Sequence, residues 1–126
     1  MLPILIAEDD EQLGRALELY LTSLGFEVSL HRAAASAKKA VLAHPGKFAF
    51  AMVDYQLGVD CGVDLAKWIL AGEPELRLVF MSGFPPGENM DLAALGDRAV
   101  FLQKPFHPRE VITCFRFLHP VLMMSM

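Results

Sequence analysis

Short apolar stretches alternate along the chain with segments in which apolar residues recur at helical spacing. The first stretch, residues 4–7, is wholly apolar and stops at a run of three acids, residues 8–10, as a strand buried on both faces would. Apolar residues then recur every three or four positions over residues 13–24, and Gly25 follows where a left-handed helix cap is favoured. The pattern therefore predicts a buried strand followed by an amphipathic helix.

The same alternation continues to the end of the chain. Four further strands are expected, at residues 26–30, 48–53, 76–81 and 99–102. Four further helices are expected: an alanine-rich one ending at residues 43–44, one over 63–70, a short one near 90–95 and one over 108–118. Parallel strands that are separated by helices need right-handed crossovers. We therefore expect an α/β fold, a doubly wound five-stranded parallel sheet with helices on both faces.

Composition narrows the class of protein. The 126 residues are 54% hydrophobic and 21% charged, which is typical of one folded domain rather than a disordered chain. We expect the domain to cover residues 1–120, with 121–126 as an apolar C-terminal tail or the start of a linker. No apolar run approaches the roughly 20 residues that span a bilayer, and no secretory signal is visible. We therefore expect a cytoplasmic protein without a membrane partner.

Charge and cysteine content argue against two further classes. A net charge of -4 disfavours a direct nucleic-acid partner, because such a surface needs clustered lysine and arginine to replace counterions. Cys61 and Cys114 are too few and too isolated for a disulfide framework or a zinc cage. We expect both thiols to be reduced.

Polar residues follow four of the expected strands. In doubly wound sheets ligands bind beyond the carboxyl ends of the strands, so these residues are expected to gather at one edge. They are Glu8, Asp9 and Asp10 after the first strand, Asp54 after the third, Ser82 after the fourth, where Gly83 comes next, and Gln103 and Lys104 after the fifth, where Pro105 and Phe106 come next. Taken alone, the three adjacent acids could be no more than the start of a helix, where the helix dipole favours them.

Together these residues have a common chemistry. Crowded carboxylates repel one another unless a cation lies among them or one is protonated. Mg²⁺ is the natural cation, because it prefers oxygen ligands and takes one or two carboxylates together with phosphoryl oxygens. The carboxylate of Asp54 could then attack phosphorus and form an aspartyl phosphate. The Lys104 ammonium and the Ser82 hydroxyl would interact with the transferred group.

Residues 4–10, Asp54, residues 82–83 and residues 104–106 resemble the motifs of the response-regulator receiver family, over essentially the whole chain. The resemblance implies a flavodoxin-like (CheY-like) sheet with strand order 2-1-3-4-5. It also implies that Asp54 accepts a phosphoryl group from the phosphohistidine of a sensor histidine kinase or of a phosphotransfer protein. Such a domain catalyses its own phosphorylation and dephosphorylation without being a conventional enzyme.

The resemblance also assigns the metal ligands. Asp9 corresponds to the direct ligand, and Glu8 corresponds to an acid that acts through water. Asp54 itself and the backbone carbonyl of Gln56, two residues further on, complete the protein ligands that the family offers to Mg²⁺. Asp10 is then a neighbour rather than a principal ligand.

The remaining family positions concern switching. Ser82 corresponds to the hydroxyl residue that responds to phosphorylation, and Phe101 corresponds to the switch aromatic. Lys104 matches the lysine three residues later, and the resemblance implies a cis peptide bond before Pro105. In the family the face formed by the last three expected elements changes on phosphorylation. That face would control an output domain or a downstream protein, or form a homodimer.

Two segments depart from the family pattern. Gly58 stands where the family usually has proline, and we expect it to loosen the loop after Asp54. Pro85 and Pro86 interrupt the region before the helix expected near 90–95, so we expect that helix to be short or mobile. Neither departure removes a residue of the expected site.

Three other functions remain open. A flavodoxin-like module that binds a phosphate-bearing ligand fits the fold, although three acids after the first strand would repel that ligand without a metal. A phosphohydrolase that uses an aspartyl phosphate would need a general acid, which residues 54–56 do not supply. A degenerate receiver would dock partners without phosphorylation. Mg²⁺-dependent labelling by acetyl phosphate or a phosphoramidate separates these functions.

Overall fold

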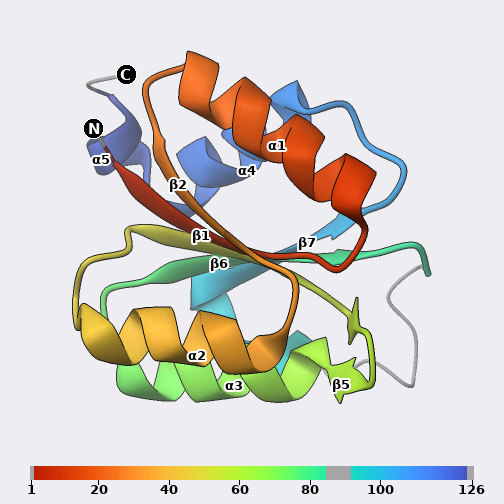
Figure 1. Cartoon of the computed structure of the whole chain (residues 1–126). Helices are drawn as coiled ribbons and strands as arrows, with labels where there is room; N and C mark the ends of the chain where they lie inside the picture. Colours follow the sequence, from red (N-terminus) through yellow and green to blue (C-terminus); the bar gives the residue numbers. More distant parts are fainter. Residues whose placement is uncertain (1, 85–91, 125–126) are drawn as a thin grey trace.

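A five-stranded parallel sheet forms the middle layer of the structure (Figure 1), a computed structural model that describes residues 2–84 and 92–124. The strand order is β2-β1-β3-β6-β7, and each neighbouring pair is parallel. Counted along the chain within this sheet, the order is the predicted 2-1-3-4-5. The strands are β1 Pro3–Ala7, β2 Glu27–His31, β3 Phe50–Asp54, β6 Arg77–Ser82 and β7 Ala99–Gln103.

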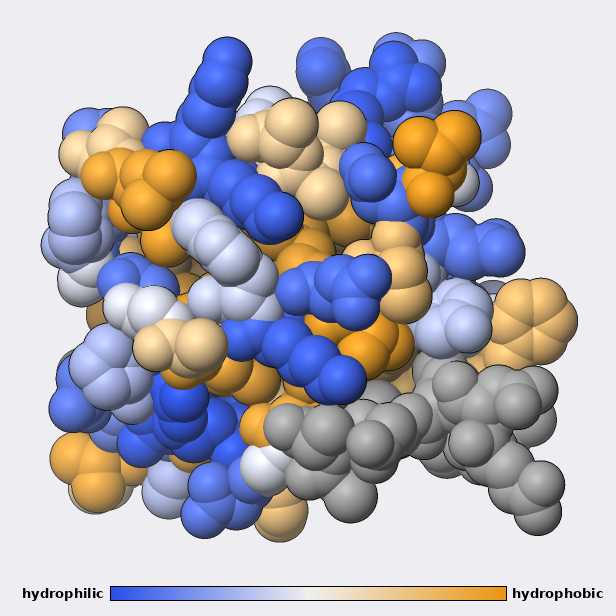
Figure 2. Space-filling view, turned by 90° about the horizontal axis from the view of Figure 1, so that it is seen from below, coloured by the Kyte–Doolittle hydropathy of each residue, from blue (hydrophilic) through white to orange (hydrophobic). Residues whose placement is uncertain are grey.

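Helices cover both faces of the sheet, which confirms the doubly wound α/β fold (Figure 1). The helices are α1 Glu11–Ser23, α2 Ala34–Ala43, α3 Gly62–Gly72, the 3₁₀ helix η1 Leu92–Arg98, α4 Arg109–Leu118 and α5 Pro120–Met123. One face carries α1, α4 and α5, and the other carries α2, α3 and η1. Figure 2 shows the α2–α3 side, where charged and apolar surface residues are interspersed. No helix in the described part of the chain has the length and apolar character needed to cross a membrane.

The central strand β3 shows why its sequence is apolar until the last residue. Phe50 and Met52 face the apolar cluster under α1 and α4, whereas Ala51 and Val53 face the cluster under α2 and α3. All four side chains are fully buried, because a helix layer covers each face of the sheet. The strand therefore presents its first polar side chain, that of Asp54, only where it reaches the edge of the sheet.

A small antiparallel sheet that the sequence did not predict follows β3. β4 Gln56–Leu57 pairs with β5 Asp60–Cys61, and Cys61 is exposed. The two-residue turn between them begins with Gly58 at φ +64°, and a glycine in this conformation at the first turn position suits a type II′ hairpin. The loop that Gly58 was expected to loosen is thus a paired hairpin, and it leads directly into α3.

Two short elements, η1 and α5, lie near the end of the chain. η1 begins at Leu92 and is interrupted at Gly96, where φ is +76°. The first residues of the helix expected near 90–95, and the prolines before it, lie outside the described residues. α5 covers the start of the segment 121–126 that was expected to be a tail, and Met123 is only 3% exposed within the α1–α4 cluster.

Candidate functional site

Three carboxylates meet at the carboxyl edge of the sheet. Asp54 is the last residue of β3, and Glu8 and Asp9 directly follow β1, the parallel neighbour of β3. The Glu8 N–H donates to the His31 carbonyl at 2.9 Å, which continues the pairing of β1 with β2 as far as the acid. One oxygen of each acid lies within 4.8 Å of the others. The sheet therefore brings the predicted metal-binding acids together.

Lys104, which follows β7, lies between two of these acids. Its Nζ is 2.6 Å from Glu8 Oε1 and 3.0 Å from Asp54 Oδ2. The Lys104 N–H donates to the Ser82 carbonyl at 2.8 Å, which extends the pairing of β6 with β7 to the lysine. The Lys104–Pro105 peptide bond is cis. The ammonium, which follows the edge strand β7, thus joins two carboxylates from the neighbouring strands β1 and β3.

Burial governs the electrostatics of this cluster. The Glu8 side chain is fully buried, and the loss of hydration raises its pKa to about 7; the hydrogen bond with Asp54 adds to the rise, while that with Lys104 opposes it. Burial alone would lower the pKa of Lys104, but its hydrogen bonds to Glu8 and Asp54 outweigh burial and raise that pKa. One ammonium therefore balances only part of the charge that three ionised carboxylates would carry.

The donor set fits a hard divalent cation. The clustered ligand atoms of Glu8, Asp9 and Asp54 are all carboxylate oxygens, which Mg²⁺ prefers, and a cation would relieve their mutual repulsion. Gln56 lines the same cleft, and its N–H lies 3.4 Å from Asp54 Oδ1. The role of the Gln56 carbonyl as a ligand stays a prediction.

The acids open onto a cleft of about 270 Å³. Ser82 lines it and is only 1% exposed, and its Oγ accepts a hydrogen bond from the Phe84 N–H at 3.0 Å. The Phe84 side chain also lines the cleft and is 62% exposed. With Asp54, Lys104 and the two acids after β1 in the same lining, the cleft contains the side chains expected to carry out phosphoryl transfer.

Phe101 lies away from this cleft. It pairs with Phe80 across β6 and β7, and its half-buried ring packs against the cluster under α2 and α3. Ser82 lies two residues beyond Phe80, so its side chain points to the same face of the sheet. Phe101 is therefore a diagonal neighbour of Ser82 and belongs to the core rather than to the cleft lining.

Asp10 takes a different role from the two acids before it. Its Oδ1 accepts hydrogen bonds from the N–H groups of Gln12 and Leu13 at 3.0 and 3.2 Å, which makes it the N-cap of α1. The Asp10 N–H in turn donates to Glu8 Oε2 at 3.1 Å. Asp10 thus starts the helix and helps to orient Glu8.

Two glycines position the acids, and the sequence analysis did not assign either of them to the site. A Cβ on Gly62, the first residue of α3, would lie 1.8 Å from the Asp54 carbonyl oxygen, so the backbones meet where only glycine fits. The Gly58 N–H donates to Asp9 Oδ2 at 3.0 Å. Glycine within a helix is costly and usually has a packing reason, but the expected helix began at residue 63, so no such signal pointed to Gly62.

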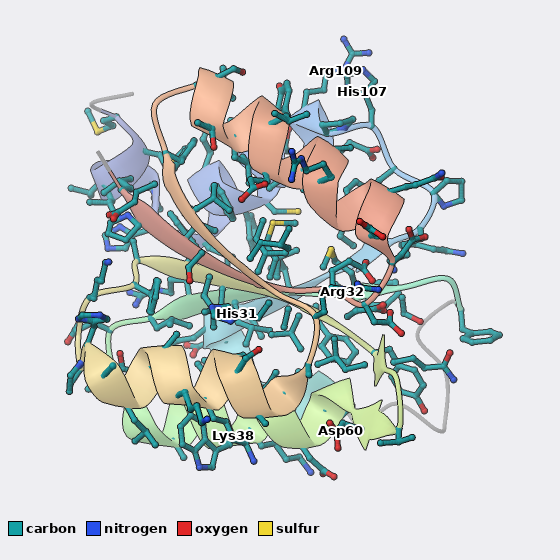
Figure 3. The ribbon with its side chains drawn as sticks, viewed as in Figure 1. His31, Arg32, Lys38, Asp60, His107 and Arg109 are labelled. Atoms are coloured by element: carbon teal, nitrogen blue, oxygen red, sulfur yellow. The ribbon has the colours of Figure 1, made fainter. Side chains whose placement is uncertain are left out.

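No histidine in the described part of the chain joins the cluster of acids. Figure 3 shows His31 and Arg32 where β2 ends and Asp60 in the β4–β5 hairpin, whereas His107 and Arg109 beside the start of α4 point outward. Among the described residues, the three clustered acids are the only group of histidine, cysteine, aspartate and glutamate arranged to hold a metal ion. A metal site here would therefore have oxygen ligands only.

Comparisons with known proteins agree with this geometry. A family model described as the response regulator receiver domain matches residues 4–116. The response regulator receiver protein CpdR of Brucella abortus is 33% identical over 110 residues, which cover 86% of this chain and 89% of CpdR. The transcriptional regulatory protein GltR of Pseudomonas aeruginosa is 28% identical over 123 residues, which cover 91% of this chain but 48% of GltR. The solved structure of the non-phosphorylated HemR receiver domain of Leptospira biflexa has a TM-score of 0.81 at 30% identity, with 94% of this chain and 95% of that chain covered.

Proposed function

This chain belongs to the response-regulator receiver family, and on that premise we propose that it accepts a phosphoryl group on Asp54 in a Mg²⁺-dependent reaction. The proposed donor is the phosphohistidine of a sensor histidine kinase or of a phosphotransfer protein. The observation that carries the proposal is the Lys104 ammonium, which bridges Glu8 and Asp54 in the lining of the cleft that would receive the phosphoryl group.

Each side chain of the cleft has a separate role in the proposed phosphoryl transfer. A carboxylate oxygen of Asp54 forms the new P–O bond while the P–N bond to the donor imidazole breaks; the imidazole leaves with the bonding electron pair and takes up a proton. Lys104 holds its positive charge beside Asp54 and stabilises charge on the phosphoryl oxygens. The buried Ser82 hydroxyl donates a hydrogen bond to one of these oxygens. The Ser82 oxygen accepts a hydrogen bond from the Phe84 N–H, and this interaction does not use the hydroxyl proton.

The metal would share the charge of the acids and the phosphoryl group. Asp9 and Asp54 would hold Mg²⁺ directly, together with the Gln56 carbonyl, and Glu8 would act through water. When bound, the ion supplies charge neutralisation that lets a dianionic group approach a carboxylate. Asp9→Asn should therefore weaken Mg²⁺ binding in a calorimetric titration while the chain stays folded.

We propose that the phosphorylated protein signals through the face formed by η1, β7 and α4. Phe101 packs at the inner side of this face, next to Ser82 across β6 and β7. The partner would be an output domain, a downstream protein or a second copy of the chain, with the protein in the cytoplasm. We propose residues 1–120 as the receiver domain. Met123, in the segment that follows, is buried in the apolar cluster under α1 and α4.

Labelling with acetyl phosphate or a phosphoramidate tests the proposal directly. In Mg²⁺ the parent should gain one phosphoryl group by mass spectrometry, and Asp54→Asn should gain none. Asp64→Asn is the matched control, since Asp64 is exposed on α3 outside the cleft. EDTA should abolish labelling of the parent. Labelling of Asp54→Asn to the level of the parent would overturn the proposal and favour another acceptor.

A further inference from the structure

The three acids of the site are held by different groups. Glu8 is bonded to Lys104 and to the Asp10 N–H, and Asp54 is bonded to Lys104. The Asp9 side chain forms no such bond with Lys104. Within residues 2–84 and 92–124, the one group that donates a hydrogen bond to the Asp9 carboxylate is the backbone N–H of Gly58. The orientation of the Asp9 carboxylate therefore depends on the β4–β5 hairpin rather than on the charged centre of the cluster.

The backbone of the hairpin explains why its N–H reaches Asp9. Leu57 pairs with Asp60, so Gly58 and Val59 form the whole turn. Gly58 adopts φ +64°, and a Cβ placed on it would meet nothing within 4 Å, so glycine is needed there for its conformation and not for space. In this conformation the Gly58 N–H points to Asp9 Oδ2 at 3.0 Å, across a sequence separation of 49 residues.

The bond is compatible with a metal at the acids. While the Gly58 N–H engages Asp9, one Asp9 oxygen still lies within 4.8 Å of oxygens from Glu8 and Asp54. A carboxylate has about four lone-pair positions on two oxygens, so one N–H leaves positions open to a cation. The hydrogen bond therefore restricts rotation of the Asp9 side chain without blocking it, and a carboxylate fixed in advance loses less entropy when it binds an ion.

We propose that the Gly58 N–H is a positioning group for the metal site, through which the β4–β5 hairpin sets the affinity for Mg²⁺. The inference deepens the proposed function, because it rests on the acids binding Mg²⁺. Gly58 would act through Asp9 and is not itself proposed as a ligand of the ion or of the phosphoryl group. The hairpin also joins Asp54 to α3, so occupation of the metal site should be felt along β4 and β5.

Two substitutions at one position separate the N–H from the turn conformation. Gly58→Asn keeps the N–H and tolerates positive φ, whereas Gly58→Pro removes the donor and cannot adopt φ +64°. By calorimetric titration Gly58→Pro should bind Mg²⁺ about tenfold more weakly than the parent, and Gly58→Asn should stay within about twofold. Thermal unfolding of both variants checks that the domain remains folded.

A spectroscopic arm tests the bond without altering the hairpin. The Gly58 amide proton in ¹⁵N-labelled parent protein should be shifted downfield by its charged acceptor, and Asp9→Ala should move it back upfield. Adding Mg²⁺ to the parent should shift the Gly58 and Cys61 amides, whereas those of α2 should not move. An unchanged Gly58 resonance in Asp9→Ala would overturn the inference even if Gly58→Pro fails to fold.

The outcomes distinguish this inference from the proposed function. If the parent binds Mg²⁺ and is phosphorylated on Asp54, but Gly58→Pro folds and binds Mg²⁺ like the parent, only the positioning role is wrong. If Gly58→Pro loses affinity while Asp54 accepts no phosphoryl group, the positioning role stands and phosphorylation is wrong. A parent that binds no Mg²⁺ would overturn both.

Discussion

Glu8 has the least ordinary environment of any single residue in the site. Its carboxyl group is fully buried, yet it is bonded to an ammonium and lies beside two other acids. Three adjacent acids look equivalent in the sequence, and elementary chemistry alone could not say which would face the cleft. The structure separates them, because β1 ends one residue before Glu8 while Asp10 is needed to cap α1. The family resemblance, not periodicity, had already singled out Glu8 and Asp9.

The pKa of Glu8 makes the stability of the metal-free protein depend on pH. Burial raises this pKa from an ordinary 4.5 to about 7, so the folded state holds the proton more tightly than the unfolded state. The resulting stabilisation is present below about pH 4.5 and is lost as pH rises to about 7, by about 1 to 3 kcal/mol. Urea unfolding in EDTA across this range should show the loss in the parent but not in Glu8→Gln. Glu75→Gln, exposed and outside the site, should behave like the parent.

Gly62 and Gly72 lie at the two ends of α3 and form a natural pair for mutation. Gly62→Ala would force a Cβ against the Asp54 carbonyl oxygen, so it should lower the free energy of unfolding by about 1 to 3 kcal/mol and slow phosphorylation. Gly72 has nothing within 4 Å of a built Cβ, so Gly72→Ala should be neutral or stabilising by up to about 1 kcal/mol. Denaturant unfolding checks both; equal effects would mean that helix propensity, not the close approach, decides.

At the scale of elements, prediction worked where a segment was long enough to show a period. The five strands and the helices α1, α2, α3 and α4 lie within a few residues of their expected bounds. β4 and β5 have two residues each, which is too short for an alternating pattern, and α5 has four. These short elements depend on what they pack against, such as the core that buries Met123, and this information is not local to their sequence.

The Arg98 side chain shows the same dependence on distant contacts. Arg98 is the last residue of η1, and its guanidinium donates to three carbonyls at the end of α3 and beyond, those of Leu70, Glu73 and Leu76, at 2.6 to 3.1 Å. Helix ends leave such carbonyls without helical partners, so the guanidinium ties η1 to α3. No spacing rule could have linked these residues.

Arg98→Ala should therefore lower the free energy of unfolding by about 1 to 3 kcal/mol, because it leaves acceptors at the helix end unpaired. Arg98→Lys should recover little of this, since one ammonium cannot span three carbonyls as a planar guanidinium does. Arg109→Ala is the control, and as a surface change it should stay within about 0.5 kcal/mol. A lysine variant as stable as the parent in thermal unfolding would show that charge alone is enough.

At the scale of the whole molecule, the site occupies one edge of the sheet. Any structural change at the site must therefore reach the rest of the protein through the strands and the helices packed on them. The order of the strands determines where the acids, the lysine and the serine meet, and alternation along β6 and β7 places Ser82 and Phe101 on the same face. The rules of connection predicted a doubly wound parallel sheet, and the family resemblance implied its strand order. Neither could predict the Gly58–Asp9 contact, which depends on the shape of one turn.

This arrangement predicts which residues should move when Asp54 is phosphorylated. With beryllofluoride and Mg²⁺, Ser82 should move toward the new acceptor oxygens and leave space for the Phe101 ring. Amide exchange should then change mainly over residues 82–106, of which 85–91 lie outside the described part, and self-association or partner binding should change with it. Ser82→Ala should reduce the response although Asp54 is still phosphorylated, and Ser36→Ala on α2 should not. Changes confined to the acids and the hairpin would make Phe101 only a core residue.

The β4–β5 hairpin also makes the unmodified protein suitable for fluorescence work. Cys61 is exposed, pairs with Gln56 and directly precedes Gly62. Cys114 is half-buried, and burial together with the charge of Glu110 raises the pKa of its thiol, which slows its reaction. A maleimide dye should therefore attach first at Cys61, without any engineered cysteine. Its emission would then test the proposed ion binding and phosphorylation from the strand that directly precedes α3.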